Sequence, residues 1–301
     1  MKFDLPEAFR KTIIQGYGNA GRKWLDDLPV IVQKCEQEWK LTLEPGTLEM
    51  SCNFVAPVHT ADRKRAILKI GFPGEVEVLT EMDALPYFRE EHSVRLLASN
   101  RERRAFLLEH LIPGTTLRTI QMMDDRKATE LALPLLRDQP VAVPKEHHFP
   151  TLADWAKVLG RMWMSPSISM PAALLDKAEA VFQKLDASKS EEKLLHGDLH
   201  HDNILFDDER GWIAIDPKGV IGDPTFHGSR FIINNWSNVP FVELLPSRVK
   251  LIADALQCSE ARIAGWAFVD YIISTCWTLE TGGKKEVDIP FVQVLEAIMN
   301  P

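Results

Sequence analysis

Apolar residues recur every three to four positions over residues 22–40, a spacing that predicts an amphipathic helix. Pro29 lies inside this stretch, and we expect it to kink the helix or to begin a second one. Just ahead, Gly16, Gly18 and Gly21 fit the GxGxxG pattern of dinucleotide-binding proteins, but only the weak strand pattern KTIIQ precedes them. We therefore expect a flexible turn before the helix rather than a nucleotide site.

Short apolar and alternating runs follow, and they predict strands. The segments 51–58 and 65–70 are separated by the polar stretch HTADRK, so we expect them to form a hairpin. The other elements expected in this part of the chain are a strand at LTLE, a helix over 75–88, and a second pair of strands over 94–100 and 104–111.

The pattern changes at Pro113 and Gly114, which interrupt regular structure. Beyond them the periodicity is helical, except where two apolar runs flank a short polar loop that ends at Gly211. Such a loop predicts a β-hairpin, formed here by 203–206 and 212–215. We therefore predict an α+β protein in two parts. Residues 1–112 carry an antiparallel sheet with a helix, and residues 113–301 are mainly helical around one hairpin.

Composition narrows the possible classes of function. The chain has 35 basic and 43 acidic residues, which argues against a protein that coats nucleic acids. It has no run of 18 apolar residues and no apolar signal segment near its start, so we expect no membrane partner. The four cysteines have no metal-binding spacing, and we expect free thiols in a reducing cytoplasm.

Three polar residues gather at one end of the predicted 203–215 hairpin. Asn203 begins the first strand, Asp216 follows the second, and Asp198 lies five residues before Asn203. Pairing about the centre of the loop sets Asn203 opposite Asp216. An amide and a carboxylate there can ligate Mg²⁺, and a second Asp can orient a hydroxyl and accept its proton. Each residue alone is an ordinary turn former, but their joint spacing after His196 favours phosphoryl transfer.

The histidines of this segment raise a different class of enzyme. His196, His200 and His201 beside Asp198 would suit a metallophosphoesterase, which binds two metal ions through Asp, His and Asn. That class needs further Asp-x-His and Gly-Asn-His segments, and the sequence contains neither. This alternative is therefore not favoured.

The stretch 196–224 resembles the catalytic segment of the aminoglycoside phosphotransferase family, a branch of the protein-kinase-like fold. The sequence IDPKG with a nearby Trp is typical of the group that phosphorylates streptomycin at its 6-hydroxyl and of the related hydroxyurea phosphotransferases. The resemblance extends from about residue 20 to 282. It implies a two-lobed fold with an ATP-binding lobe over 1–112 and a catalytic and acceptor-binding lobe over 113–301, and it implies ATP and Mg²⁺ as cofactors.

The resemblance also assigns roles within the catalytic segment. Asp198 matches the catalytic base, and Asn203 and Asp216 match the two metal ligands. His196 is expected to pack under the catalytic loop with a satisfied hydrogen bond. His227 stands where the family usually has an Asp, and this departure is expected to leave the three catalytic positions intact.

In the first lobe, Lys69 matches the lysine that binds the ATP phosphates. Such a lysine needs a carboxylate partner on the next helix, and Glu75, Glu77 and Glu81 are available. Glu81 matches the family best.

Two more ATP contacts are implied. The stretch 106–111, followed by Pro113, resembles the hinge between lobes, so the Glu109 carbonyl and the Leu111 amide are expected to bind adenine. The loop over the phosphates is poor in glycine, and Ser51 with Asn53 is expected to donate to phosphate there.

The acceptor is expected to be a small molecule. A cationic acceptor such as streptomycin would suit Glu280, which lies beside Trp277, because an aromatic face next to a carboxylate favours ammonium and guanidinium groups. The resemblance thus predicts a kinase for a streptomycin-like or hydroxyurea-like hydroxyl, of the kind associated with antibiotic resistance. Two alternatives stay open: a kinase of choline, homoserine or a sugar amine, and a kinase-like nucleotide-binding module without activity.

Overall fold

The computed structural model describes residues 5–44, 50, 52–164, 170–234 and 240–300. Contacts divide the chain into two compact units. The first unit is Met1–Pro86 with Val94–Ile112, and the second is Tyr87–Ser93 with Pro113–Pro301. The short segment 87–93 belongs with the second unit because the Ala214 N–H donates to the His92 carbonyl at 3.0 Å.

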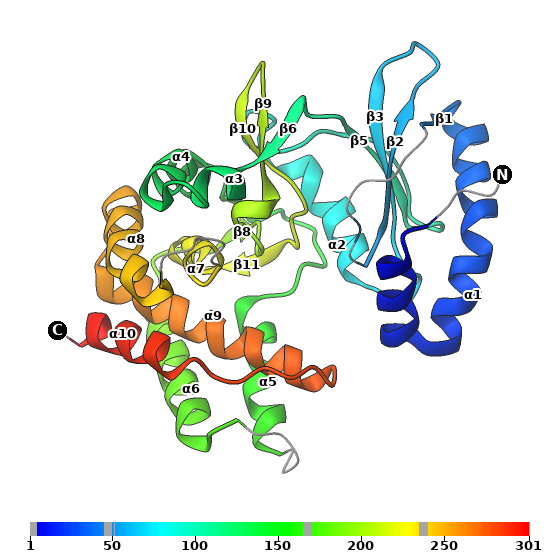
Figure 1. Cartoon of the computed structure of the whole chain (residues 1–301). Helices are drawn as coiled ribbons and strands as arrows, with labels where there is room; N and C mark the ends of the chain where they lie inside the picture. Colours follow the sequence, from blue (N-terminus) through cyan, green and yellow to red (C-terminus); the bar gives the residue numbers. More distant parts are fainter. Residues whose placement is uncertain (1–4, 45–49, 51, 165–169, 235–239, 301) are drawn as a thin grey trace. The chain divides into compact units, whose positions relative to one another are not determined.

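The first unit is built on a five-stranded antiparallel sheet with the strand order β1-β2-β3-β5-β4 (Figure 1). The predicted hairpin of β2 and β3 is confirmed, as is the pairing of β4 with β5. On β3, Ala66, Leu68 and Ile70 are buried on the core side, as the two-residue period of a strand requires. The strands are β1 (Thr42–Leu43), β2 (Phe54–His59), β3 (Arg65–Ile70), β4 (Leu96–Asn100) and β5 (Ala105–Glu109).

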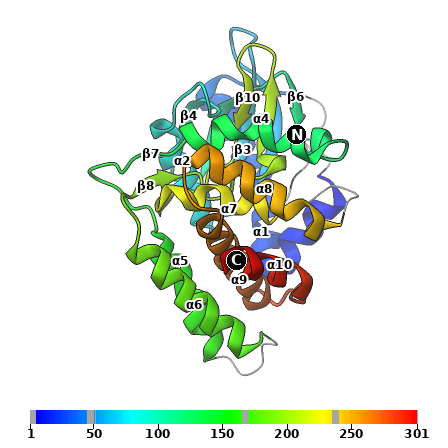
Figure 2. The same ribbon diagram turned by 90° about the vertical axis from the view of Figure 1, so that its left-hand side faces the viewer.

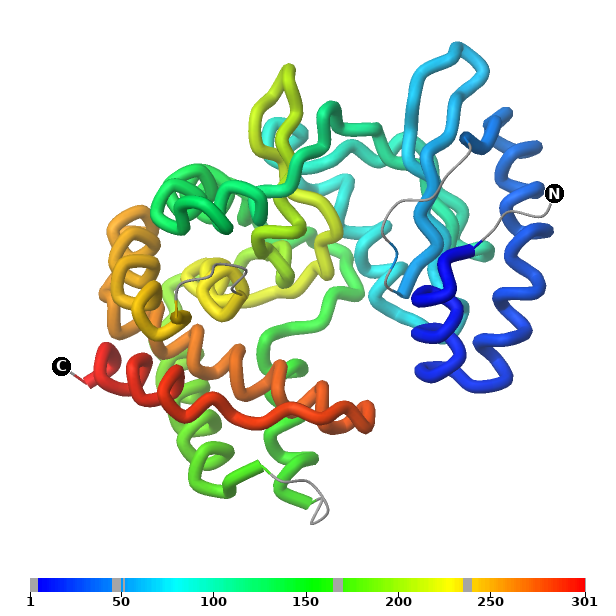
Figure 3. Tube along the Cα trace, viewed as in Figure 1, coloured from blue at the N-terminus to red at the C-terminus, as the bar shows by residue number. Residues whose placement is uncertain are grey.

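Helix α1 (Glu7–Trp39) is broken at Gly18, whose φ of 56° and ψ of −129° are not helical. Two helical arms therefore run side by side, as Figure 3 traces. A Cβ on Gly21 would lie 2.5 Å from the Ile13 carbonyl oxygen, so only glycine permits this close approach. The predicted turn before the helix corresponds to the break at Gly18, but residues 7–17 ahead of it form a helical arm that was not predicted. Pro29 does not interrupt the second arm, since the break lies at Gly18.

The two arms and the sheet share one apolar core. The rings of Phe9 and Trp24 lie 6.1 Å apart across the arms, and both pack in the cluster that contains Phe54 and Leu68 of the sheet. Burying one such side chain stabilises the fold by about 1.5–3 kcal/mol. Helix α2 (Glu77–Ala84) follows β3 and continues as the 3-10 turn η1 (Leu85–Tyr87).

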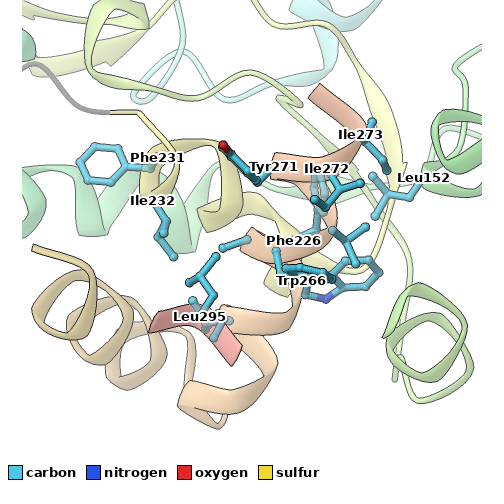
Figure 4. Packing of buried hydrophobic residues seen from close by; sticks show 14 of the residues in the cluster. Leu152, Phe226, Phe231, Ile232, Trp266, Tyr271, Ile272, Ile273 and Leu295 are labelled. Atoms are coloured by element: carbon cyan, nitrogen blue, oxygen red, sulfur yellow. The ribbon is translucent and has the colours of Figure 1, made fainter. Parts of the chain in front are cut away.

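The second unit is mainly helical and is organised around α9, which is buried on nearly every side. A helix that is apolar all round belongs in a core. Figure 4 shows Trp266 and Ile272 of this helix beside Phe226, with Leu152 close by. Helices α5 and α6 lie side by side at the edge of this unit (Figure 2). The helices are α3 (Leu117–Gln121), α4 (Asp125–Asp138), α5 (Leu152–Trp163), α6 (Ala172–Ala187), α7 (Ser229–Ile232), α8 (Phe241–Leu256), α9 (Glu260–Glu280) and α10 (Ile289–Met299).

The second unit also contains two small antiparallel sheets, ordered β10-β9-β6 and β11-β8-β7. The predicted hairpin is β9 with β10. The expectation of a single hairpin among helices is wrong, because strands of two to four residues flank it and were too short to give a periodic signal. The strands are β6 (Pro113–Thr116), β7 (Val141–Ala142), β8 (Lys193–Leu195), β9 (Ile204–Asp207), β10 (Gly211–Ala214) and β11 (Val220–Gly222), with 3-10 turns η2 (His201–Asn203) and η3 (Pro224–Gly228).

Two expectations from composition concern the whole chain. No cysteine takes part in a disulfide. Within the described ranges, no helix is long and apolar enough to cross a membrane.

Candidate active site

In the first unit, Lys69 and Glu81 form a buried ion pair. The Lys69 Nζ donates to both carboxylate oxygens of Glu81, at 2.9 and 2.7 Å. Both residues are at most 5% exposed. A buried pair contributes little net stability after desolvation, so its position marks a candidate functional site more than a structural one.

Local periodicity explains why Glu81 is the partner. Lys69 lies on the face of β3 opposite Leu68 and Ile70, and Glu81 lies on the buried stripe of α2 with Val78. Glu75, by contrast, accepts a hydrogen bond from the Tyr17 hydroxyl at 2.6 Å, and Glu77 is exposed. Of the three candidate carboxylates, the structure joins Glu81 to Lys69.

The residues expected to bind adenine lie at the end of β5. Glu109 is its last residue, and its N–H donates to the Arg95 carbonyl at 3.1 Å. The Glu109 carboxylate accepts from the Arg95 N–H at 2.8 Å, so side chain and backbone are both fixed. Leu111, two residues on, is buried. Ser51 lies outside the described residues.

In the second unit, His196 follows β8 and is hydrogen-bonded both to Asp198 in the next loop and to Ile215 just after β10. Its Nδ1 accepts from the Asp198 N–H at 3.2 Å, which leaves Nε2 to donate to the Ile215 carbonyl at 2.8 Å. Burial lowers the pKa of His196 to about 3, so the ring is neutral. His196 is thus the buried, hydrogen-bonded histidine that the sequence predicted.

Gly197, which leads into Asp198, has a φ of 80°. A Cβ there would lie 2.9 Å from the Trp155 ring and 3.1 Å from Val220. Both the left-handed backbone and the lack of space therefore require glycine. The chain turns sharply here and presents Asp198 at the end of β8.

Asn203 is tied to Asp198 through its side-chain amide. The Asn203 Nδ2 donates to the Asp198 backbone carbonyl at 2.9 Å. Only the amide nitrogen can donate to a carbonyl, so this bond fixes the orientation of the group and leaves Oδ1 as the atom that could ligate a metal.

Asp216 does not lie directly opposite Asn203, as the sequence predicted. The register pairs Ala214 with Ile204, and the Ile215 N–H donates to the Asn203 carbonyl at 2.9 Å, so Asn203 faces Ile215. Asp216 follows with a φ of 59°, a left-handed conformation that ends the strand and is uncommon outside glycine. Strain of this kind concentrates at functional sites.

The donor chemistry of this segment fits Mg²⁺. Asn203 and Asp216 supply one amide and one carboxylate oxygen, which are hard ligands. Among the residues that the structure describes, no group of three or more His, Cys, Asp or Glu side chains could hold a metal. A sparse oxygen set suits Mg²⁺, which keeps several waters and binds phosphate oxygens.

Two cations flank the Asp198 carboxylate. The Arg230 Nε lies 3.4 Å from Oδ1, and the Lys218 Nζ lies 3.9 Å from Oδ2. Burial raises the pKa of Asp198, but Lys218 and Arg230 outweigh it, so the pKa is lowered and the group is ionised at neutral pH. Sequence reasoning missed both as site residues. The IDPKG motif could have drawn attention to Lys218, but no local signal marks Arg230.

Glu280 lies at the end of α9, where its carboxylate is already engaged. Arg161 of α5 donates to both Glu280 oxygens, at 2.7 and 3.0 Å. The neighbouring Trp277 ring lies 5.9 Å from the Lys218 Nζ rather than stacking on an acidic partner. The structure therefore joins Glu280 to Arg161, and it joins Trp277 to the surroundings of Asp198.

Comparisons with known proteins agree with this geometry. The sequence model for "aminoglycoside/hydroxyurea antibiotic resistance kinase" matches residues 38–282. The chain is 28% identical to streptomycin 6-kinase of Streptomyces griseus, over 99% of this chain and 97% of the relative. It is also 28% identical to hydroxyurea phosphotransferase of Kitasatospora aureofaciens, over 98% of this chain and 85% of the relative.

Solved structures show the same fold. Choline kinase LicA of Streptococcus pneumoniae superposes with a TM-score of 0.61 at 14% identity, over 90% of this chain and 98% of that chain. The aminoglycoside phosphotransferase APH(4)-Ia superposes with a TM-score of 0.60 at 11% identity, over 90% and 98%. The predicted two-lobed, kinase-like α+β fold is confirmed. The chain belongs to the aminoglycoside/hydroxyurea antibiotic resistance kinase family, and it is a small-molecule phosphotransferase whose acceptor group is a hydroxyl.

Proposed function

We propose that this kinase transfers the γ-phosphoryl group of ATP to a hydroxyl of a streptomycin-like or hydroxyurea-like acceptor, in the cytoplasm. The observation that carries the proposal is the bond from the Asn203 amide to the Asp198 carbonyl, because it ties a metal ligand to a base. This bond positions the two residues relative to each other, and positioning supplies most of the catalysis in phosphoryl transfer.

The first unit is proposed to bind the nucleotide. Lys69, held by Glu81, would contact the α- and β-phosphates, and its two hydrogen bonds to Glu81 keep the ammonium in place. The Glu109 carbonyl and the Leu111 amide would bind adenine, and Ser51 would donate to phosphate.

The second unit is proposed to carry the transfer step. Asn203 and Asp216 would hold Mg²⁺, which when bound neutralises phosphate charge. Asp198 would accept a hydrogen bond from the acceptor hydroxyl and then its proton. An ionised carboxylate with a lowered pKa is a weak base, but this suffices because the transition state is loose and orientation matters more than basicity.

The acceptor is proposed from the relatives' names, streptomycin 6-kinase and hydroxyurea phosphotransferase. The two acceptors in these names differ in charge, since streptomycin is cationic and hydroxyurea is neutral. Glu280 is the proposed contact for a cationic acceptor, in competition with Arg161.

A coupled ADP-release assay with Mg·ATP tests the proposal. The acceptors are streptomycin, other aminoglycosides, hydroxyurea, and simple amino alcohols such as choline. Turnover with streptomycin or hydroxyurea that disappears in Asp198→Asn supports it, provided that the variant still binds Mg·ADP. Turnover with an amino alcohol alone would move the acceptor to the choline type. No turnover and no nucleotide binding would favour an inactive module.

A further inference from the structure

Helix α1 holds none of the residues proposed to bind ATP or to carry out the transfer, yet it contacts the segment that leads into α2. Tyr17 is the last residue of the first arm before the break at Gly18. Its ring stacks on Phe72, with centroids 3.9 Å apart, and its hydroxyl donates to Glu75 Oε1 at 2.6 Å. Both partners lie in the segment 71–76, which joins β3 to α2. One side chain of α1 therefore holds this connection at two points.

Both contacts of Tyr17 are of a kind that fixes position. The hydrogen bond is short and its acceptor is a carboxylate, and charge-assisted bonds of this length are about twice as strong as neutral ones. Burial, followed by the hydrogen bond to Glu75, raises the pKa of Tyr17, so the hydroxyl keeps its proton and remains the donor. Phe72 is buried and also meets the ring of Trp24 edge-on, at 5.8 Å. The Phe72 ring is thus contacted by both arms of α1.

The backbone of the same segment is tied to the sheet by Arg104, which precedes β5. The Gly71 N–H donates to the Arg104 carbonyl at 2.9 Å, and the Arg104 guanidinium donates to the Glu75 carbonyl. Arg104 therefore holds the main chain of 71–76, while Tyr17 holds two of its side chains against α1.

Helix α2 packs directly on this segment. A Cβ on Gly71 would lie 2.2 Å from the Val78 side chain, so the start of the segment and the first turn of α2 are in close contact. Glu81 lies three residues after Val78 on the same buried stripe. A shift of the segment would move this stripe and, with it, the two hydrogen bonds from Lys69 to Glu81.

We propose that Tyr17 is a positioning residue for nucleotide binding, because it fixes the connection between β3 and α2 and so holds Glu81 where it pairs with Lys69. It acts through Phe72 and Glu75 and makes no contact with ATP. The first arm of α1 then supports the phosphate-binding lysine as well as covering the sheet. This inference rests on the proposed function, in which Lys69 contacts the α- and β-phosphates.

Two affinities test this role without an acceptor. The Kd for adenosine divided by the Kd for Mg·ADP measures what the phosphates contribute, and calorimetry gives both values, by displacement for the weaker ligand. Tyr17→Phe keeps the stack on Phe72 and loses the bond to Glu75, so this ratio should fall about threefold. Tyr17→Ala loses both contacts, and the ratio should fall about tenfold while the Kd for adenosine changes less than about twofold.

Variants of Glu75 show whether the hydrogen bond is responsible. Glu75→Ala should match Tyr17→Phe, and the double variant should be no weaker than either single one, because all three remove the same contact. Glu75→Gln keeps an acceptor oxygen and should retain most of the wild-type ratio.

Hydrogen exchange reports on α2 directly. The amides of Glu77–Ala84 should exchange about tenfold faster in Tyr17→Ala, because the connection ahead of the helix is released. The matched control is Ile13→Val, since Ile13 is buried in the same arm against Gly21. It should lower the melting temperature through lost packing and leave the ratio of affinities unchanged.

The outcomes separate the two levels of inference. If the wild-type protein does not prefer Mg·ADP to adenosine, Lys69 does not bind the phosphates, and the proposed function fails together with the role of Tyr17. If the wild type has this preference and both Tyr17 variants keep it, only the role of Tyr17 is overturned. A fall of the ratio that Ile13→Val shares would also overturn it, because the effect would then follow stability. If Tyr17→Ala does not fold, Tyr17→Phe and the Glu75 variants decide the question.

Discussion

The Lys69–Glu81 pair and the loop around Asp198 hold charged groups in place by different means. The first lies on a regular strand and a regular helix, and burial of both partners fixes it. The second lies on irregular backbone, with positive φ at Gly197 and Asp216. There, hydrogen bonds between neighbouring loops replace secondary structure.

This difference has an energetic consequence. Removing one partner of a buried pair leaves a desolvated charge, so in the first unit function and folding should fail together. Around Asp198 the framework bonds use backbone groups, the Asn203 amide and His196, while the reactive carboxylates are partly exposed. In the second unit, therefore, a substitution should be able to remove activity without lowering the stability of the fold.

The largest expected effect tests that separation. Asp216→Asn should lower kcat at least about 10³-fold, because it removes the carboxylate proposed to hold Mg²⁺. The melting temperature should stay within about 2 °C, since Asn tolerates the left-handed backbone as well as Asp does. Steady-state kinetics and calorimetry check both values, with Asp208→Asn in the β9–β10 turn as the control. A fall of stability in parallel with activity would refute separability.

The next effect concerns the first unit. Lys69→Met should destabilise the protein by about 3–5 kcal/mol, because the buried Glu81 carboxylate loses both hydrogen bonds from the Lys69 ammonium. The double variant Lys69→Met with Glu81→Leu should recover most of that stability and no activity. Urea unfolding and ADP release measure the two properties. If the single variant unfolds like the wild type, burial does not couple this pair to folding.

These two regions also differ in how far the sequence predicted them. The resemblance to the family selected Glu81 among three glutamates. In the structure, strand alternation in β3 and the buried stripe of α2 explain why Glu81 meets Lys69, because regular elements translate spacing into direction. The spacing of Asp198, Asn203 and Asp216 brought the loop residues to one end of a hairpin, but the register was one residue off. Such a slip exchanges the faces of a strand, and the positive φ of Asp216, which redirects its side chain, is invisible in the sequence.

Contacts between distant segments were beyond sequence reasoning. Arg230 contacts Asp270 because α7 packs against α9, and the local sequence of neither segment predicts this contact. The glycines of α1 were misleading for another reason, because the same glycine spacing is compatible with a dinucleotide site and with a helical hairpin. Gly18 and Gly21 allow a helical hairpin, and the dinucleotide pattern they fit is incidental.

A smaller effect follows from buried histidines in the second unit. Burial lowers the pKa of His196 to about 3 and of His227 to about 4, so the unfolded chain takes up protons first as pH falls. Their contribution to stability is complete above the ordinary pKa of about 6.5 and is lost below it, down to the folded values. As the pH falls from 6.5 to 5.0, each histidine should lower the free energy of unfolding by about 1.5 kcal/mol.

Replacement of one histidine isolates its share. His227→Asn keeps a donor for the Leu136 carbonyl, which His227 contacts through Nδ1 at 3.0 Å, and removes the titration. The loss of unfolding free energy between pH 6.5 and 5.0 should shrink by about 1.5 kcal/mol. Exposed His148→Asn is the control and should change nothing. An unchanged pH dependence in His227→Asn would show that this ring does not titrate on unfolding.

The smallest effect separates structure from recognition at Glu280. Its pair with Arg161 is partly exposed, so breaking it should change stability by less than about 1 kcal/mol. If Glu280 binds a cationic acceptor, however, the two sides of the pair should act in opposite directions. Glu280→Gln should raise the KM for streptomycin severalfold, whereas Arg161→Gln releases the carboxylate and should lower it. Neither should move the KM for neutral hydroxyurea. Equal shifts in both variants would instead mean that the pair only joins α5 to α9, and that the acceptor contacts lie closer to Trp277.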